Sequence, residues 1–431
     1  MKRYTFFLIL VMVVIFPGCK KEEDPVPVAP TADETARDAL YSIMKTYYLW
    51  YKEMPTVTKS NYPDPYELLN AMRYKKLDRW SYIQKYQDFV DQTNATFVGH
   101  GIRIGLDHTN KTRIVQIYNK SPLYSLGVRR GWIIKKLNGT ELAPIFVAGD
   151  ANAYYTLIGK SEAGVTNTFL FETPEGKDST ITSTKTTFTM NTVLYYDTLK
   201  LNSGVAGYIV YDQFVGPSKA EFETAFAFFQ ANNVKDIIVD LRYNGGGDLT
   251  VLQNLAAHIA GPSKYGEPFL TLTHNDQKIS LNQTYSFGTV TSSITASRMV
   301  VITTRSTASA SEDLINGLKP FIPITTIGDT TNGKPVGMYG FEHKKLYMFW
   351  PISFELLNSA GDGDFYEGFA PKKYVPDDVT HDWGDRNEAC LKEAIYFLET
   401  GNVSSKGEYS SSRSVQFDEK NNKPGNLYLV K

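Results

Sequence analysis

The sequence predicts a multidomain α/β protein, with a helical N-terminal subdomain, a β-rich middle domain and an α/β core on a mostly parallel sheet. Three observations support this fold class. Apolar residues repeat at helical spacing over 33–92, short strands and turns follow from about residue 96, and apolar strands alternate with helices from about residue 204. The chain has 431 residues, 42% of them hydrophobic, which is enough for two or three domains with their own cores.

The first 18 residues have the pattern of an export signal. A basic start precedes an apolar run that is short for a membrane span and ends in FPGC. These four residues resemble a bacterial lipobox, and the resemblance implies that Cys19 carries lipid. We therefore expect a lipoprotein signal peptide over 1–18 and a charged, Pro-rich tether over 19–32. The lipid would hold the protein in the outer membrane, facing the periplasm or the exterior. A cleaved signal without lipid is the alternative.

A helical subdomain is expected over residues 33–95. Apolar residues repeat at helical spacing from Ala36 to Tyr48, and Pro55 is expected to end that run. A second helix is expected to start after Asp64, because Pro65 suits the first position of a helix.

Residues 96–190 have the turn signals of a small β-rich domain. Ser121-Pro122 precedes a short helix, and a strand from Ile133 ends in Asn138-Gly139. This order resembles a PDZ domain, with a generic small β-barrel as the alternative. The resemblance implies that an extended peptide adds to an open strand edge. We place that edge at Gly101, Ile102, Arg103 and Ile104.

The α/β core is expected over residues 191–400. Its strands are predicted at 207–214, 236–242, 299–304 and 324–329, with helices between them. Near-continuous apolar strands are buried on both faces, which is typical of a parallel sheet. Residues 401–431 are polar and are expected to form a C-terminal tail.

The segment Ser306–Pro320 joins a run of small residues to a helix. Ser309 and Glu312 fit a capping box, so Ser309 could do no more than cap that helix. Small residues on either side of Ser309 would also leave the helix N-terminus accessible. A serine on a strand–turn–helix junction has the geometry of a nucleophile, with the helix dipole beside it.

A nucleophilic serine needs a base, and Lys334 is the candidate. None of the six histidines lies in a pattern that indicates a triad. Lys334 follows the last predicted strand, and it could act as a base if burial lowered its pKa. The alternative is a lysine in solvent, because Asn332-Gly333 is a turn signal.

Three glycines follow a predicted buried strand in the segment Asp240–Asp248. Glycines let backbone amides approach a ligand closely. The segment fits no nucleotide-binding pattern, so oxyanion donors are the better interpretation. We predict no cofactor and no metal. The formal net charge of −1 argues against nucleic acid as a partner.

Together these segments resemble the C-terminal processing (tail-specific) peptidases of family S41, which use a Ser–Lys dyad and have a crotonase-like core. The family pattern S-A-S-E falls on 309–312 and G-K on Gly333-Lys334, and D-L-R-x-N-x-G-G falls within 240–247. The resemblance implies that Ser309 is the nucleophile and Lys334 the base. It also implies oxyanion donors, namely the amides of Gly246 or Gly247 and of Ala310.

The chain departs from the family at two positions. A Gln that follows the lysine by four residues in many members is Met338 here, and an Asp that follows the serine by eleven is Pro320. Glu312 remains as a third member of the site, either orienting the dyad or only capping the helix.

The sequence therefore predicts a lipid-anchored serine endopeptidase that acts on protein or peptide segments, recognising C-terminal or unstructured regions through the PDZ-like domain. An inactive peptide-binding lipoprotein of the same fold is the alternative. A glycan-binding lipoprotein is a third hypothesis, which depends on aromatic content alone.

Overall fold

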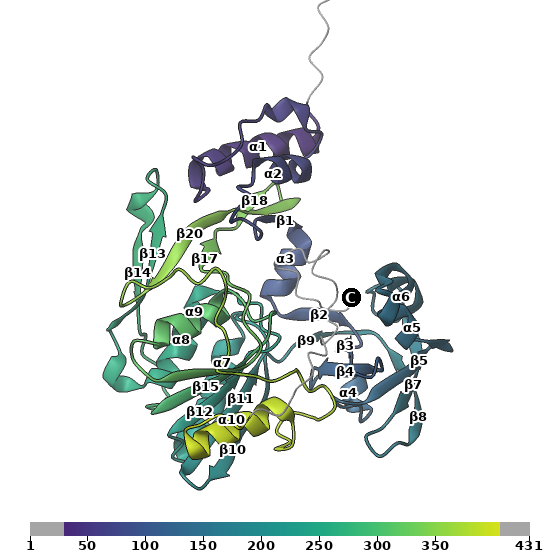
Figure 1. Cartoon of the computed structure of the whole chain (residues 1–431). Coiled ribbons are helices and arrows are strands. Elements are labelled where there is room, and N and C mark those ends of the chain that lie inside the picture. Colours follow the sequence, from purple (N-terminus) through teal and green to yellow (C-terminus); the bar gives the residue numbers. More distant parts are fainter. Residues whose placement is uncertain (1–29, 406–431) are drawn as a thin grey trace, which may run out of the picture.

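The computed structural model describes residues 30–405 (Figure 1). The predicted signal peptide, Cys19, most of the tether and most of the tail lie outside the described residues. Within 30–405, no helix is both long and apolar enough to cross a membrane.

Two N-terminal helices confirm the predicted helical segments. They are α1 (Ala32–Tyr47) and α2 (Pro65–Met72), and each starts at a residue whose side chain accepts a hydrogen bond from the first turn. The prediction that the first helix runs to Pro55 was wrong. The chain turns at Tyr48, whose buried hydroxyl donates to Asp78 at 2.7 Å.

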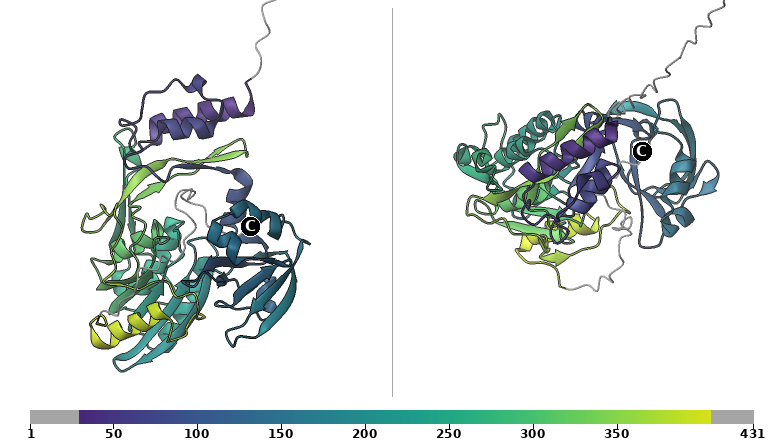
Figure 2. Two further views of the ribbon diagram at one scale, coloured as in Figure 1. Left: turned by 45° about the vertical axis from the view of Figure 1, so that its right-hand side comes forward. Right: turned by 90° about the horizontal axis from the view of Figure 1, so that it is seen from above.

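A three-stranded antiparallel sheet ties the N-terminal segment to a hairpin from late in the chain. Strand β1 (Tyr82–Lys85) pairs with β19 (Tyr347–Trp350), which pairs with β18 (Phe341–His343). The buried faces of α1 and α2 pack against this sheet in one hydrophobic cluster. Helix α3 (Tyr86–Thr93) then leads to the β-rich domain, which lies beside the core in Figure 2.

The β-rich domain has an antiparallel sheet with the strand order β3-β4-β5-β7-β8, so β3 and β8 are its two edge strands. Within residues 30–405, β3 pairs only with β4. Its elements are β2 (Thr96–Gly99), β3 (Ile102–Leu106), β4 (Thr112–Ile117), α4 (Pro122–Ser125), β5 (Ile133–Leu137), β6 (Thr140–Glu141), α5 (Ala143–Ala148), α6 (Ala151–Ile158), β7 (Thr166–Glu172), β8 (Asp178–Thr184) and β9 (Thr186–Thr189). The predicted short helix after Ser121 and the strand from Ile133 are confirmed.

The core sheet has the order β10-β11-β12-β15-β16-β21, in which all neighbouring pairs except β10 and β11 are parallel. Its strands and helices are β10 (Val193–Leu201), β11 (Gly204–Tyr211), α7 (Ser218–Ala231), β12 (Asp236–Asp240), α8 (Leu249–Ala260), β15 (Arg298–Thr303), α9 (Ala310–Leu318), β16 (Ile324–Gly328), β21 (Lys373–Tyr374) and α10 (Ala389–Thr400). Ile237 and Val239 pack with α7, α8 and α9, whereas Ile238 packs with α10. Both faces are buried, as the apolar strands predicted.

A second antiparallel sheet, which the sequence did not predict, packs beside the core. Its order is β14-β13-β20-β17, and its strands are β13 (Pro268–His274), β14 (Gln283–Ser286), β17 (Val336–Met338) and β20 (Ile352–Asn358). Three short 3-10 turns complete the elements: η1 (Lys59–Asn61), η2 (Pro262–Lys264) and η3 (Ile279–Leu281).

Candidate active site

Ser309 lies on the turn between β15 and α9. Its backbone φ of 55° and ψ of −123° fall where residues with a side chain rarely lie, so the turn holds Ser309 in a strained conformation. The segment Asp240–Asp248 (the Gly segment) packs directly on this turn. A Cβ added at Gly246 would lie 2.8 Å from the Cβ of Ser309. Only glycine fits between the two backbones, which brings the two predicted segments together.

The helix start uses the backbone of Ser309 more than its hydroxyl. The amide of Glu312, which a capping serine would bond through Oγ, donates to the carbonyl of Ser309 at 2.7 Å, and the amide of Asp313 donates to the same carbonyl at 2.8 Å. In the other direction, the Ser309 amide donates to Oε2 of Glu312 at 3.0 Å. The start of α9 is thus held by the Ser309 carbonyl and the Glu312 carboxylate, and the two residues form the predicted capping box.

Glu312 connects the turn that carries Ser309 (the serine turn) to the turn that carries Lys334 (the lysine turn). Its Oε1 accepts from the Gly333 amide at 2.6 Å, and its Oε2 accepts from the amides of Lys334 (2.8 Å) and Ser309 (3.0 Å). The side chain is fully buried, and this burial raises the pKa of Glu312, while the hydrogen bonds that it accepts oppose the rise. One carboxylate thus fixes the backbone of both predicted dyad residues.

Lys334 lies on the segment between β16 and β17 and is partly buried. Burial lowers the pKa of the Lys334 ammonium to about 8, against the opposing charges of Asp313, Glu312 and Asp78. A lysine that titrates there can act as a base near neutral pH, which a lysine on an ordinary solvent-exposed turn cannot do.

The N-terminal segment holds the lysine turn from its other side. Nη2 of Arg79 donates to the carbonyl oxygens of Asn332 (2.9 Å), Gly333 (3.3 Å) and Tyr366 (3.1 Å). The Trp80 indole donates to Oδ1 of Asn332 at 3.0 Å. Sequence reasoning missed these residues, because no local signal connects them with a turn that lies about 250 residues further along the chain.

Asn244 fixes the Gly segment against the serine turn. Its Oδ1 accepts from the Gly246 amide at 2.9 Å, and its carbonyl accepts from the Ala308 amide at 3.1 Å and from Oγ of Ser311 at 3.0 Å. The Gly246 amide already donates to Asn244, which favours Gly247 among the two predicted alternatives. The amides of Gly247 and Ala310 have no hydrogen-bond partner in residues 30–405. These two remain as the predicted donors.

A buried charge cluster supports the strand end that precedes the Gly segment. Arg242 bonds Asp240 (2.7 Å), Asp377 (2.8 Å) and Glu388 (2.8 Å), and the Arg242 side chain is buried. The hydroxyl of Tyr243 donates to Asp377 as well. The sequence singled out Arg242 but neither Asp377 nor Glu388, which follow it by more than 130 residues.

The residues predicted to bind peptide lie at the start of the open edge strand β3. Ile102 and Ile104 point into the core of the β-rich domain, with 5% and 3% of their surface exposed. Arg103 points the other way, 3.6 Å from Asp212 of the α/β core. Gly101 precedes the strand with a φ of 72°, and a Cβ there would clash with neighbouring side chains. On its other side, the backbone of β3 pairs with no strand of residues 30–405.

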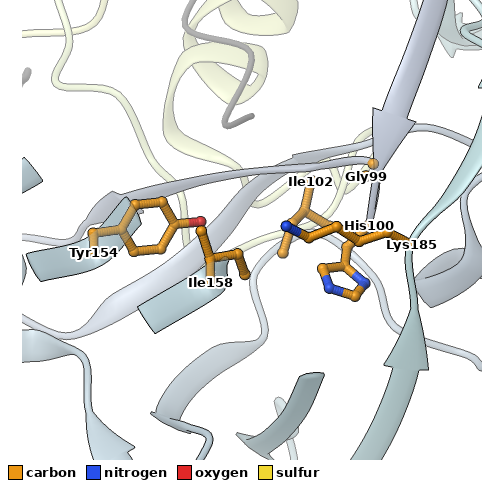
Figure 3. Close-up of a pocket in the computed structure, with 7 residues that line it drawn as sticks. Gly99, His100, Ile102, Tyr154, Ile158 and Lys185 are labelled. Atoms are coloured by element: carbon orange, nitrogen blue, oxygen red, sulfur yellow. The ribbon is translucent and has the colours of Figure 1, made fainter. Parts of the chain in front are cut away.

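A small pocket lies where β3 begins (Figure 3). It is lined by Gly99, His100, Gly101, Ile102, Tyr154, Ile158 and Lys185. Nζ of Lys185 donates to the carbonyl oxygens of Gly159 (2.9 Å) and Lys160 (2.6 Å), and the Tyr154 hydroxyl has no partner within the described chain. In residues 30–405, no group of three or more His, Cys, Asp or Glu side chains is arranged to hold a metal.

Two regions of the chain, one in the α/β core and one in the N-terminal helical segment, match known protein families. Residues 205–349 match the description "Peptidase family S41", and residues 36–82 match "Peptidase S41 N-terminal domain". The carboxy-terminal processing protease CtpB of Bacillus subtilis (strain 168) is 25% identical over 320 residues. This alignment covers 73% of the present chain and only 63% of the length of CtpB.

One solved structure shares the fold of this chain. The crystal structure of an S41 protease from Bacteroides fragilis NCTC 9343 superposes with a TM-score of 0.70 and 22% identity, and the match covers 89% of this chain and all of that one. A photosystem II D1 C-terminal processing protease gives a TM-score of 0.48 and 18% identity, over 80% of this chain and 94% of its own.

Proposed function

Since the chain belongs to peptidase family S41, a family of serine peptidases, we propose that it is a serine endopeptidase with Ser309 as nucleophile and Lys334 as general base. One observation carries this assignment: the Glu312 carboxylate holds the strained Ser309 turn and the Lys334 backbone together. The free amides of Gly247 and Ala310 beside that turn support the same assignment.

The proposed reaction has two stages. Nζ of neutral Lys334 takes the proton from Oγ of Ser309 as Oγ attacks the peptide carbonyl, and the amides of Gly247 and Ala310 donate to the resulting oxyanion. The intermediate expels the amine, which takes the proton from Lys334, and leaves an acyl ester on Ser309. Water then hydrolyses this ester with Lys334 again as base.

The experiment that tests this function is covalent labelling with a fluorophosphonate, which reacts with activated serines. We expect the probe to label the intact protein on Ser309 and to leave Ser309→Ala unlabelled. Absence of labelling in the intact, folded protein would instead support the inactive peptide-binding alternative.

We also propose that the β-rich domain is PDZ-like and selects substrates by their C-terminus. The free edge of β3 supports strand addition, and the pocket at Gly101 lies where the end of the added peptide would reach. Peptides with a free, apolar C-terminus are expected to bind the full-length Ser309→Ala protein, and amidation of the terminus should weaken binding at least tenfold in a fluorescence titration. Equal affinities would exclude carboxylate recognition.

The lipid anchor stays a proposal, since Cys19 lies outside the described residues. Cys19→Ser is expected to move the protein from the membrane fraction to the soluble fraction with unchanged peptidase activity. Recovery of the unaltered protein in the soluble fraction would show that Cys19 does not anchor the chain to the outer membrane.

A further inference from the structure

Asp313 is a fully buried carboxyl group on the helix that follows the proposed nucleophile. Its amide donates to the Ser309 carbonyl at 2.8 Å, so it lies one helical turn after Ser309 and on the same face of α9. Neither of its side-chain oxygens has a hydrogen-bond partner in the described part of the chain. A buried carboxyl group without a donor is costly, so its retention here needs an explanation.

Three acidic side chains act electrostatically on the ammonium group of Lys334, namely Asp313, Glu312 and Asp78. Both oxygens of Glu312 already accept from backbone amides. The Asp78 carboxylate accepts from the Tyr48 hydroxyl and from two amides, those of Trp80 and Ser81. Asp313 is therefore the one acid of the three whose oxygens are both open to a donor.

Lys334 is the cation that acts on Asp313. Burial raises the pKa of the Asp313 carboxyl well above its usual range, the charge of Glu312 raises it further, and Lys334 lowers it. The positive charge of a protonated Lys334 therefore makes Asp313 easier to ionise than burial and Glu312 alone would allow. Within residues 30–405, the backbone amide of Lys334 donates to Glu312, and the Lys334 side chain forms no hydrogen bond or ion pair within 4 Å.

On the basis of the proposed Ser–Lys mechanism, we propose that Asp313 is the positioning residue of Lys334. Its carboxylate attracts Nζ of Lys334 and balances the ammonium charge that forms when the Oγ–H bond of Ser309 breaks and an Nζ–H bond forms. Asp313 exchanges no proton in this step. The proton remains on Nζ until the leaving amine takes it.

Asp313→Asn tests this role, because it keeps the size of the side chain and removes the charge. An ionised Asp313 raises the pKa of Lys334. Loss of the Asp313 charge should therefore shift the pH at which kcat rises (the rising limb of the pH profile) downward by about one pH unit. The kcat on the plateau should fall at least tenfold, because the amine is a weaker and less well oriented base, while KM should change less than twofold.

Asn316→Ala is the matched control. Asn316 is also buried on α9 and bonds Asp362 and Asn358, but it carries no charge, so its loss should lower the melting temperature without moving the limb. The proposal would be overturned if Asp313→Asn changed neither kcat nor the pH at which kcat rises.

A second measurement needs no change at Asp313 and no activity. In Ser309→Ala protein with 13C-labelled Asp and Lys side chains, the Asp313 carboxyl and the Lys334 ε-carbon should titrate together in two shared steps. Independent titration of the two groups would refute the proposal even if Asp313→Asn did not fold. Labelling of Ser309 by the fluorophosphonate, together with loss of activity in Lys334→Ala, would leave the proposed function standing in that case.

Discussion

Lys334→Ala and Ser309→Ala are both expected to abolish measurable cleavage of an unfolded protein substrate. A positioned general base contributes roughly 10²–10⁴-fold to the rate, and the serine cannot attack without it. Because the two side chains act as one unit, each single variant should lose about as much as the double variant. The measurement is kcat/KM on a fluorogenic peptide, with circular dichroism to show that each variant folds.

The activity of the intact enzyme should rise with pH through about 8, because the pKa of Lys334 is lowered to about 8 and only the neutral amine can accept the serine proton. Activity then stays level until other groups titrate. Measurable activity in Lys334→Ala would end the Ser–Lys assignment and return attention to the histidines.

Glu312→Gln is expected to lower kcat by on the order of 10²-fold, because small displacements of catalytic groups have effects of that size. Both carboxylate oxygens accept from backbone amides, and the NH₂ group of Gln cannot accept. At least one buried amide loses its partner, which costs about 1–3 kcal/mol. The turns that carry Ser309 and Lys334 should then separate.

Glu393→Gln is the matched control for this change. Glu393 is 5% exposed and accepts hydrogen bonds from the amide and hydroxyl of Ser404, but it lies on α10, on the opposite face of the sheet from α9. It should lose similar stability by urea denaturation and keep its kcat. Full activity in Glu312→Gln would show that Glu312 only completes the helix start.

Much of the fold could be predicted where the signal was local. The continuous apolar run of β12 and the apolar repeat of the helix α8 that follows it are properties of short segments. The sheet that contains β13 and β20 was missed, because its strands pair across about 80 residues and the polar residues in them resemble loops.

The candidate site also contains some residues that the sequence could predict and others that it could not. Ser309, Lys334 and Gly247 lie in segments with distinctive local composition, so sequence could nominate them. Asp313 follows Glu312 directly and could pass for a charged residue on an exposed helix face. Only the packing of α9 shows that Asp313 is buried. Only the hydrogen bonds that Glu312 and Asp78 accept from other groups single out the Asp313 carboxylate as the acid without a donor.

The hydrogen bonds from Arg79 and Trp80 to the lysine turn affect the order in which the site is assembled during folding. The hydrogen bonds close a loop of about 250 residues, and such long-range contacts form slowly, since they need the intervening chain to be ordered first. The serine turn and the Gly segment are closer in sequence and can meet earlier. Glu312 can join the serine and lysine turns early as well, because it bonds residues only about 22 positions away. The contacts of Arg79 and Trp80 would thus be the last to form, and the proposed site would be complete only when the N-terminal segment has packed against it.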